Sequence, residues 1–254
     1  MGPGNSYNFI LIMKSKIIEN IKTIFYALII ALIIRSLFFQ PFYIPSSSME
    51  PNLLVGDRLF ASKYSYGYSR HSFPFSPNIF DNRIFEKKPV VGDVIVFKTP
   101  ADNRTDYIKR LIGLPGDKII IKDGELHINN ILVERKMIKA NQDINCGGEV
   151  FKAKIFEEKL PNGVKHKVAY RTDGTMLNTD LYLVPKDHYF FMGDNRDCSK
   201  DSRFLSSVGY VHLDNMVGKA KITFFSNNKE IAKFYEFWKW HKSIRLDKIF
   251  KKIQ

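Results

Sequence analysis

The chain is poor in cysteine and in acidic residues. Its 254 residues include only two cysteines, Cys146 and Cys198, so a disulfide-rich scaffold is excluded. The two could form one bridge at most, which leaves the redox compartment undecided. Acidic residues number 26 against 39 lysines and arginines, a formal net charge of +13. This excess predicts a negatively charged partner, either nucleic acid, anionic lipid or an acidic substrate.

Several common catalytic signatures are missing too. There is no G-x-S-x-G elbow for a nucleophilic serine and no H-E-x-x-H zinc pair. Read as a calcium loop from Asp194, the chain has Ser199 where glycine is required and Leu205 where glutamate is required. We expect no metal and no cofactor. The histidines are scattered, as lone structural histidines usually are: His71, His127, His166, His188, His212 and His241.

One long hydrophobic run is present, near the N-terminus. Residues 24–34 carry no charge, and over 23–39 the only charge is Arg35, whose side chain can reach the membrane interface. A span of about 17 residues is near the lower limit for crossing a bilayer. The run therefore predicts a transmembrane anchor over 23–42, against the alternative of a buried core helix. It lacks the small-residue cleavage site of a removable signal peptide.

The flanking charges predict how this anchor is oriented. Lys14, Lys16 and Lys22 precede the run, and no lysine or arginine occurs between Arg35 and Arg58. Because positive charge stays on the cytoplasmic side, we expect residues 1–22 in the cytoplasm and residues 43–254 outside it.

Beyond the anchor, the pattern is mostly that of β-strands. Residues 91–98 and 118–129 carry β-branched runs, and Asp123-Gly124 in the second run is a hairpin signal. Residues 149–184 repeat this pattern, with Asn162-Gly163 and Asp173-Gly174 between short runs.

A serine cluster and a lysine strand are the first candidate catalytic residues. PSSSMEP (45–51) follows the anchor directly, and a serine nucleophile needs a base. In TDYIKRLIGLPGD (105–117), a strand would place Lys109 on the same face as Tyr107 and Leu111. Desolvation on such a face lowers a lysine pKa and makes the amine a usable base.

A third segment, GDNRDCSKDSR (193–203), has the composition of a tightly hydrogen-bonded loop. The anchor, the serine cluster, the lysine strand and this loop occur in an order that resembles bacterial signal peptidase I, over roughly residues 24–226. The resemblance implies a mainly β fold, with an antiparallel β-sheet catalytic domain, an inserted β-rich subdomain (124–185) and one preceding transmembrane helix.

The resemblance also implies roles for individual residues. Ser48 matches the nucleophile and Lys109 the general base. Ser46 matches the serine whose hydroxyl joins the Ser48 N–H in the oxyanion hole. Met49 and Tyr107 become candidates for the substrate pocket.

The loop 193–203 would support this dyad. Ser199 matches the serine that hydrogen-bonds and orients the catalytic lysine. Asp201 would pair with Arg203, and Asp194 with Arg110 on the outer face of the lysine strand. Cys198 stands where the family commonly has asparagine, and a cysteine inside this loop argues against a bridge to Cys146.

The implied activity is removal of signal peptides from exported preproteins at the bacterial inner membrane, with the lipid bilayer as a partner. Nucleic acid is not expected, since the basic domain would lie outside the cytoplasm. The alternative is a non-catalytic, membrane-anchored β-domain that binds envelope components. A penicillin-binding enzyme is disfavoured, because S-x-x-K at 226–229 lacks its S-D-N and K-T-G companions.

Two further segments allow more than one interpretation. The aromatic stretch 64–85 is either an ordinary surface loop or an apolar rim that enters the membrane interface. The basic tail 229–254 is either solvated with a core-docked end or an amphipathic helix on anionic lipid. Its apolar positions have near-helical spacing: Phe234, Trp238, Leu246, Ile249, Phe250 and Ile253.

Overall fold

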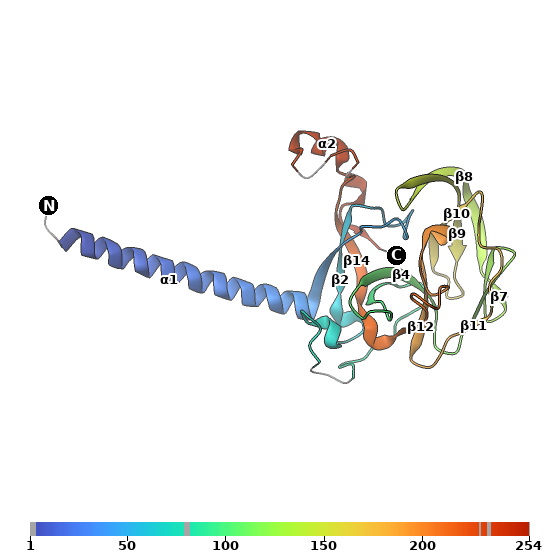
Figure 1. Cartoon of the computed structure of the whole chain (residues 1–254), viewed down its shortest axis with the longest axis horizontal. Helices are drawn as coiled ribbons and strands as arrows, with labels where there is room; N and C mark the ends of the chain where they lie inside the picture. Colours follow the sequence, from blue (N-terminus) through green and yellow to red (C-terminus); the bar gives the residue numbers. More distant parts are fainter. Residues whose placement is uncertain (1–3, 79–81, 229, 233–234, 254) are drawn as a thin grey trace.

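A long helix projects from a β-rich body (Figure 1). The computed structural model describes residues 4–78, 82–228, 230–232 and 235–253, with side chains from residue 13 onward. Helix α1 (Gly4–Ile33) continues through a π-helical turn, Ile34–Phe38, and leads directly into β1. Its segment Met13–Phe38 is long and apolar enough to cross a membrane and is not buried against the body. This helix overlaps the anchor expected at 23–42, but it begins earlier, and Phe39 already belongs to a strand.

The body is built on an eight-stranded antiparallel sheet. Its strands lie in the order β1-β2-β14-β3-β4-β12-β13, and β15 pairs with β14. This arrangement confirms the prediction of a mainly β, antiparallel fold. The strands are β1 (Phe39–Tyr43), β2 (Asp57–Ser62), β3 (Val94–Lys98), β4 (Asp106–Gly113), β12 (His188–Met192), β13 (Val211–His212), β14 (Met216–Ser226) and β15 (Lys251–Lys252).

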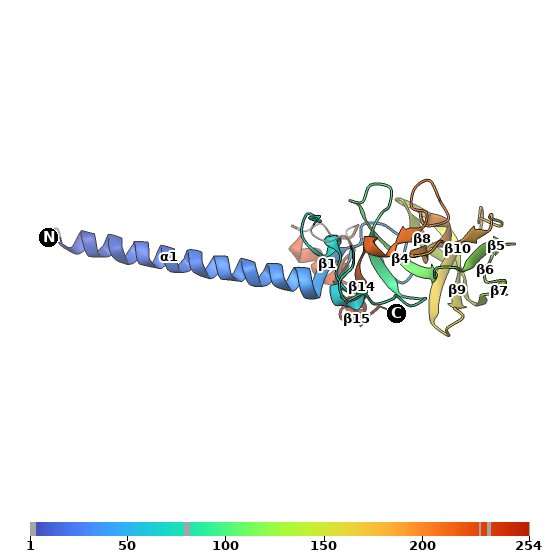
Figure 2. The ribbon, with the colours of Figure 1, turned by 90° about the horizontal axis from the view of Figure 1, so that it is seen from below.

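The chain between β4 and β12 forms two smaller sheets at the end of the body farthest from α1 (Figure 2). One has the order β11-β5-β6-β7 and the other β10-β9-β8. The boundary expected at 124 falls inside the β5–β6 hairpin, so we propose that the insertion comprises 114–187. The strands are β5 (Lys118–Lys122), β6 (Glu125–Ile128), β7 (Ile131–Leu132), β8 (Glu134–Cys146), β9 (Glu149–Lys159), β10 (Lys165–Arg171) and β11 (Tyr182–Leu183).

The hairpin predicted at Asp123-Gly124 is confirmed. Lys122 pairs with Glu125 across the turn, and both turn residues have positive φ, 50° at Asp123 and 74° at Gly124. Aspartate and glycine tolerate this left-handed backbone, which matches the twist of the two strands. A local sequence signal was sufficient here.

Strand β4 also has the alternation expected of it. Leu111 and the partly buried Tyr107 pack in one core cluster with Phe97 and Phe191. Ile112, on the opposite face, packs in a second cluster beneath the β5–β6 sheet. Both faces of β4 are thus covered from Lys109 onward, and the polar side chains of Lys109 and Arg110 are withdrawn from water.

Of the two interpretations of the tail, the amphipathic helix is wrong. Among the described residues of the tail, the only α-helical segment is α2 (Trp240–Ser243), and β15 pairs with β14 through Ile222 and Lys252. Backbone pairing with the open edge of a strand outweighs the helical spacing of the side chains. Of the tail residues named above, Phe234 lies outside the described residues, as does Lys229, the first residue of the tail.

The aromatic stretch 64–85 is fixed at both of its ends. Tyr68 pairs with Ile84 in an isolated bridge, and the Tyr68 hydroxyl donates to the Leu37 carbonyl at 2.9 Å. Tyr66 is buried, whereas Phe75 is fully exposed. Residues 79–81 lie outside the described residues. Entry of this stretch into a membrane interface stays a prediction.

Candidate active site

The serine cluster lies in the connection between β1 and β2. The Ile44 N–H donates to the Asp57 carbonyl at 2.9 Å, and the Gly56 N–H donates to the Ile44 carbonyl at 3.0 Å, so the two ends of the connection are closed on each other. Met49 is fully buried in a core cluster with Leu53. The buried Met49 side chain thus fixes the position of the preceding serines at the surface of the sheet.

Ser48 and Lys109 are in direct contact. Lys109 Nζ lies 2.6 Å from Ser48 Oγ and 3.0 Å from the Ile108 carbonyl oxygen. The lysine residue is 3% exposed, and Ser48 is 7% exposed. The predicted nucleophile and the predicted base, more than 60 positions apart in the chain, are therefore brought within hydrogen-bonding distance by the sheet.

Burial lowers the pKa of Lys109 to about 8. Desolvation is the largest cause, Arg203 acts in the same direction, and the carboxylates of Asp201 and Asp194 oppose it. A substantial fraction of the amine is therefore neutral near pH 8, as a general base requires.

Ser46 lies on the open side of the nucleophile. Its Oγ is 3.3 Å from Ser48 Oγ, and its residue is exposed, whereas Ser47 and Ser48 are buried. The position next to the reacting oxygen fits an oxyanion donor, a role that stays a proposal.

Ser199 does not contact the lysine as expected. Its buried hydroxyl acts on the Asp201 carboxyl, whose pKa it helps to lower, and no hydrogen bond joins it to Lys109 among the described residues. Its place near the site is nevertheless fixed by Gly193. A Cβ added to that glycine would lie 2.2 Å from Ser199 Oγ and 2.5 Å from the Ser48 carbonyl oxygen. The backbone of Gly193 thus lies between Ser48 and Ser199, and the space between these two residues admits no side chain larger than that of glycine.

The two ion pairs expected around this loop are present. Arg203 Nε lies 2.8 Å from Asp201 Oδ1, and Asp201 Oδ2 also accepts from the Gly193 N–H at 2.9 Å. Arg110 makes a bidentate pair with Asp194, with both distances 2.8 Å.

The Arg110–Asp194 pair is not on an exposed outer face, because both side chains are only 1% exposed. Asn52 Nδ2 donates to the same aspartate at 2.7 Å, and the Ala169 N–H of β10 donates to the Asp194 carbonyl at 2.9 Å. The β8–β10 sheet covers that face of the lysine strand.

A cleft of about 370 Å³ opens onto the dyad. Tyr107 lines it, as predicted, but Met49 does not, because its side chain lies in the core beneath the serines. The assignment of Met49 to the pocket is therefore corrected. Further lining residues are Phe42, Tyr43, Ile44, Val96, Ile108, Cys198 and Lys200.

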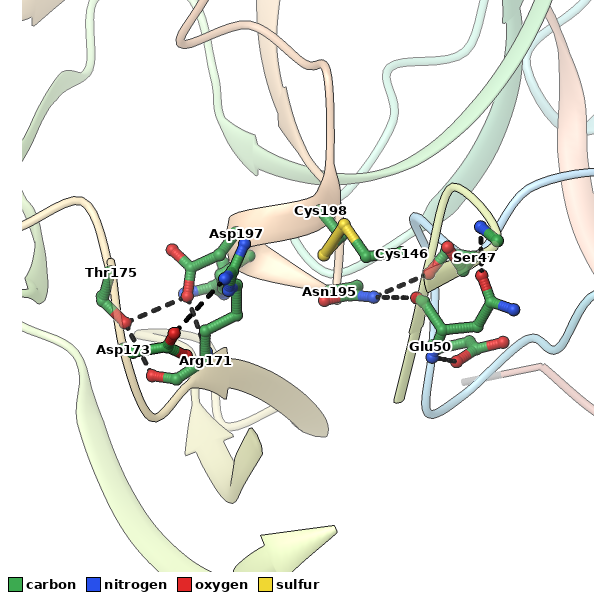
Figure 3. The surroundings of a disulfide bond; sticks show 12 residues. Ser47, Glu50, Cys146, Arg171, Asp173, Thr175, Asn195, Asp197 and Cys198 are labelled. Carbon is green, nitrogen blue, oxygen red and sulfur yellow. Dashed lines mark hydrogen bonds and ion pairs between the residues drawn. A yellow bond between two sulfur atoms is a disulfide. The ribbon is translucent and has the colours of Figure 1, made fainter. Parts of the chain in front are cut away.

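Cys146 and Cys198 form a disulfide, contrary to the expectation from the sequence (Figure 3). Their Cα atoms are 5.4 Å apart, and the bond joins the end of β8 to the 3-10 turn Arg196–Cys198. The expectation failed because the fold of the insertion, which no local pattern reveals, brings β8 back onto this loop.

Asn195 is a site residue that sequence reasoning missed. It is fully buried, its Nδ2 donates to the Ser47 carbonyl at 3.1 Å and to the Asn145 carbonyl at 3.2 Å, and its N–H donates to the Ser48 carbonyl at 3.1 Å (Figure 3). It thus ties the nucleophile loop to the end of β8 beside the disulfide. Its place in the polar loop 193–203 was the only signal in the sequence.

Comparison with known proteins gives the family. Residues 17–225 match the family described as signal peptidase, peptidase S26. The chain belongs to this family. It is 40% identical over 246 residues to a signal peptidase I of Rickettsia typhi and 39% identical over 245 residues to one of Rickettsia prowazekii, with 90% of each chain covered in both cases.

A solved signal peptidase I from Enterococcus faecalis matches with 27% identity, covering 52% of this chain and 97% of that chain, at a TM-score of 0.31. The family membership makes this chain a serine peptidase that processes signal peptides, and it disfavours the alternative of a non-catalytic binding domain. The apolar helix α1 is consistent with a membrane-anchored member of the family.

Proposed function

We propose that Ser48 and Lys109 form the catalytic dyad of this signal peptidase. The observation that carries the proposal is the 2.6 Å contact between the two side chains inside the cleft. When the amine is neutral, the serine hydroxyl donates its proton to Nζ across this contact, and Oγ attacks the scissile carbonyl carbon. The resulting ammonium can then protonate the leaving amine, which leaves an ester between Ser48 and the signal peptide.

Water completes the reaction by the same proton path. Neutral Lys109 takes a proton from a water molecule, the hydroxide attacks the ester carbonyl, and Ser48 Oγ regains its proton as the acid is released. In both steps a negative oxygen develops on the carbonyl. The Ser48 N–H and the Ser46 hydroxyl would stabilise that oxygen, and each such donor contributes about 3 kcal/mol in other serine peptidases.

The substrate would lie extended in the cleft. β1 is an edge strand of the main sheet, and the cleft runs along its end and along the start of β4. An extended segment at an open edge can add backbone hydrogen bonds, and alternate side chains then enter the cleft. The family resemblance implies small residues at the first and third positions before the cut.

For the location, we propose a single-pass protein of the bacterial inner membrane with its short N-terminal segment in the cytoplasm. The lysines before the hydrophobic run support this orientation. Since only a short strand, Phe39–Tyr43, separates the end of the helix from the serine cluster, the nucleophile stays near the membrane surface. Cleavage sites of exported preproteins emerge at that height.

The dyad is tested with adjacent serines. Ser48→Ala should abolish cleavage of a purified preprotein by the full chain, measured by product formation with the cut site mapped. Ser47→Ala is the matched control: this residue is also buried, and its backbone carbonyl keeps the bond to Asn195. The control should retain most of the activity. Equal activity of the two variants would refute the assignment of the nucleophile.

A further inference from the structure

A second cavity, of about 600 Å³, lies where α1 meets the β-rich body. Four separate parts of the chain line it: Arg35 and Gln40 at the end of the helix and in β1, the turn 70–76, the connection 98–106 between β3 and β4, and Val217 in β14. Asp106 lines both this cavity and the active-site cleft, so the two are neighbours but distinct. The proposed mechanism uses no residue that belongs to this cavity alone.

Three guanidinium groups line the cavity, those of Arg35, Arg70 and Arg104. Among the described residues, no carboxylate forms an ion pair with Arg35, Arg70 or Arg104. The two carboxylates in the wall already have partners in or beside the same wall. Asp106 pairs with Lys98 at 2.8 Å, and Asp102 accepts from the backbone N–H groups of Arg104 and Thr105 at 2.8 and 2.9 Å.

The charges around the cavity act on two buried groups beside it. Burial lowers the pKa of Lys63 to about 7, Asp106 opposes this lowering, and Arg35 and Lys98 add to it. The pKa of His71 is lowered to about 4, again mainly by burial, with Arg70 as the next cause. An anion in the cavity would relieve this repulsion.

The position of the cavity indicates what kind of anion it meets. Arg35 lies in the last turn of the segment Met13–Phe38, which has the length and composition of a membrane span. A span of that length ends at the level of the lipid headgroups. Phe75 lines the same cavity with its side chain fully exposed, and aromatic rings at this level favour the interface over water.

We propose that this cavity binds the phosphate of an anionic phospholipid headgroup, held by Arg35, Arg70 and Arg104. Arginine suits this ligand because its planar group donates two parallel hydrogen bonds to phosphate oxygens. The three side chains come from three different segments, so binding joins the end of the membrane helix to the turn 70–76 and to the connection that leads into the Lys109 strand. The proposal does not depend on the identity of the catalytic residues.

The test uses the full chain in detergent micelles, with phosphatidylglycerol or phosphatidylcholine added and bound lipid counted by native mass spectrometry. We expect one phosphatidylglycerol molecule to stay bound to each protein molecule, and we expect no phosphatidylcholine to bind with similar affinity. Arg70→Gln with Arg104→Gln should weaken this binding at least tenfold. Lys136→Gln with Lys154→Gln removes the same charge from exposed positions on β8 and β9 and should leave it unchanged.

A second arm separates lipid from free phosphate. Glycerol phosphate, tested on the same micelles, should compete only at concentrations far above those of the lipid. The His71 pKa, followed by NMR, should rise when phosphatidylglycerol binds to wild type and stay in place in the arginine variant. Equal losses of phosphatidylglycerol binding in the arginine and lysine double variants would show that only the overall charge matters. That result would overturn the proposal. Glycerol phosphate that bound as tightly as the lipid would overturn the lipid assignment.

Discussion

Cys198 is bonded to Cys146 across 52 residues of chain, and the residue that follows it is Ser199. This bond fixes the end of β8 to the loop 193–203, which also carries Asp194 and Asp201. Asn195 adds hydrogen bonds from the same loop to Ser47 and Ser48. The insertion between β4 and β12 is thereby part of the support of the active site.

The disulfide should contribute measurably to stability. Closing a loop of this length restricts the unfolded chain and is worth about 2–4 kcal/mol in small domains. Cys146→Ser with Cys198→Ser should lower the free energy of unfolding by about that amount and reduce cleavage severalfold, since Asn195 still holds the loop. Denaturant titration and a cleavage assay measure the two effects.

Thiol reductant provides the control for this prediction. It should weaken wild type to the level of the double variant and have no effect on the variant itself. A wild-type protein that reductant leaves fully stable and active would show that the bond has no supporting role.

Lys109→Met should abolish cleavage and leave the fold intact. Methionine fills the space of the lysine stem but cannot accept a proton, so the Ser48 hydroxyl loses its base. Lys63→Met is the matched control, because Lys63 is also buried with a lowered pKa of about 7 but has no contact with the dyad. Single-turnover cleavage and circular dichroism should show an inactive folded protein for the first variant and an active one for the second.

The activity should rise with pH through an apparent pKa of about 8, because only neutral Lys109 is a base. The lowered pKa of Lys109 also makes the stability of the fold rise with pH. Its pKa is lower in the folded state than in the unfolded state, so the unfolded chain binds more protons between pH 8 and 10.5. Its burial penalty is fully present below pH 8 and disappears as the pH rises through this window.

The rate profile of preprotein cleavage between pH 6 and 10 measures this pKa, and the unfolding midpoints of wild type and Lys109→Met measure the linkage. A rate that still climbed steeply at pH 10 would contradict the tuning of this lysine by burial.

Gly193→Ala should inactivate the enzyme through a steric effect alone. The φ angle of this glycine is not in the left-handed region, so alanine could adopt the backbone conformation. Its Cβ, however, would overlap Ser199 and the Ser48 carbonyl oxygen and push the two loops apart. Core overpacking of this kind costs about 1–3 kcal/mol.

Gly116→Ala is the opposite case, since its φ is 91° but no atom lies within 4 Å of the added carbon. It should lose about 1 kcal/mol of stability and keep its cleavage rate. Thermal unfolding and the cleavage rate, measured on both variants, separate strain in the backbone from displacement of the nucleophile.

Elements that depend on neighbouring residues alone could be predicted from the sequence. A run of apolar residues specifies a membrane-compatible helix, because each side chain meets the lipid independently of the rest of the fold. The Asp123-Gly124 turn and the alternation around Lys109 follow from the conformational preferences of a few adjacent residues. The resemblance carried by the order of the motifs, which the family match supports, also predicted the contact of Ser48 with Lys109, the place of Tyr107 in the cleft and the two ion pairs.

Only the tertiary structure decided which distant segments meet. The Cys146–Cys198 bond, the bonds of Asn195 and the buried state of the Arg110–Asp194 pair all depend on how the β8–β10 sheet folds back onto β4 and the loop 193–203. Met49 lies in the core and not in the predicted pocket. The end of the tail pairs with β14, although the spacing of its apolar residues also allowed a helix. In each case the free energy of a long-range contact outweighed a local preference, and such contacts leave no pattern in neighbouring residues.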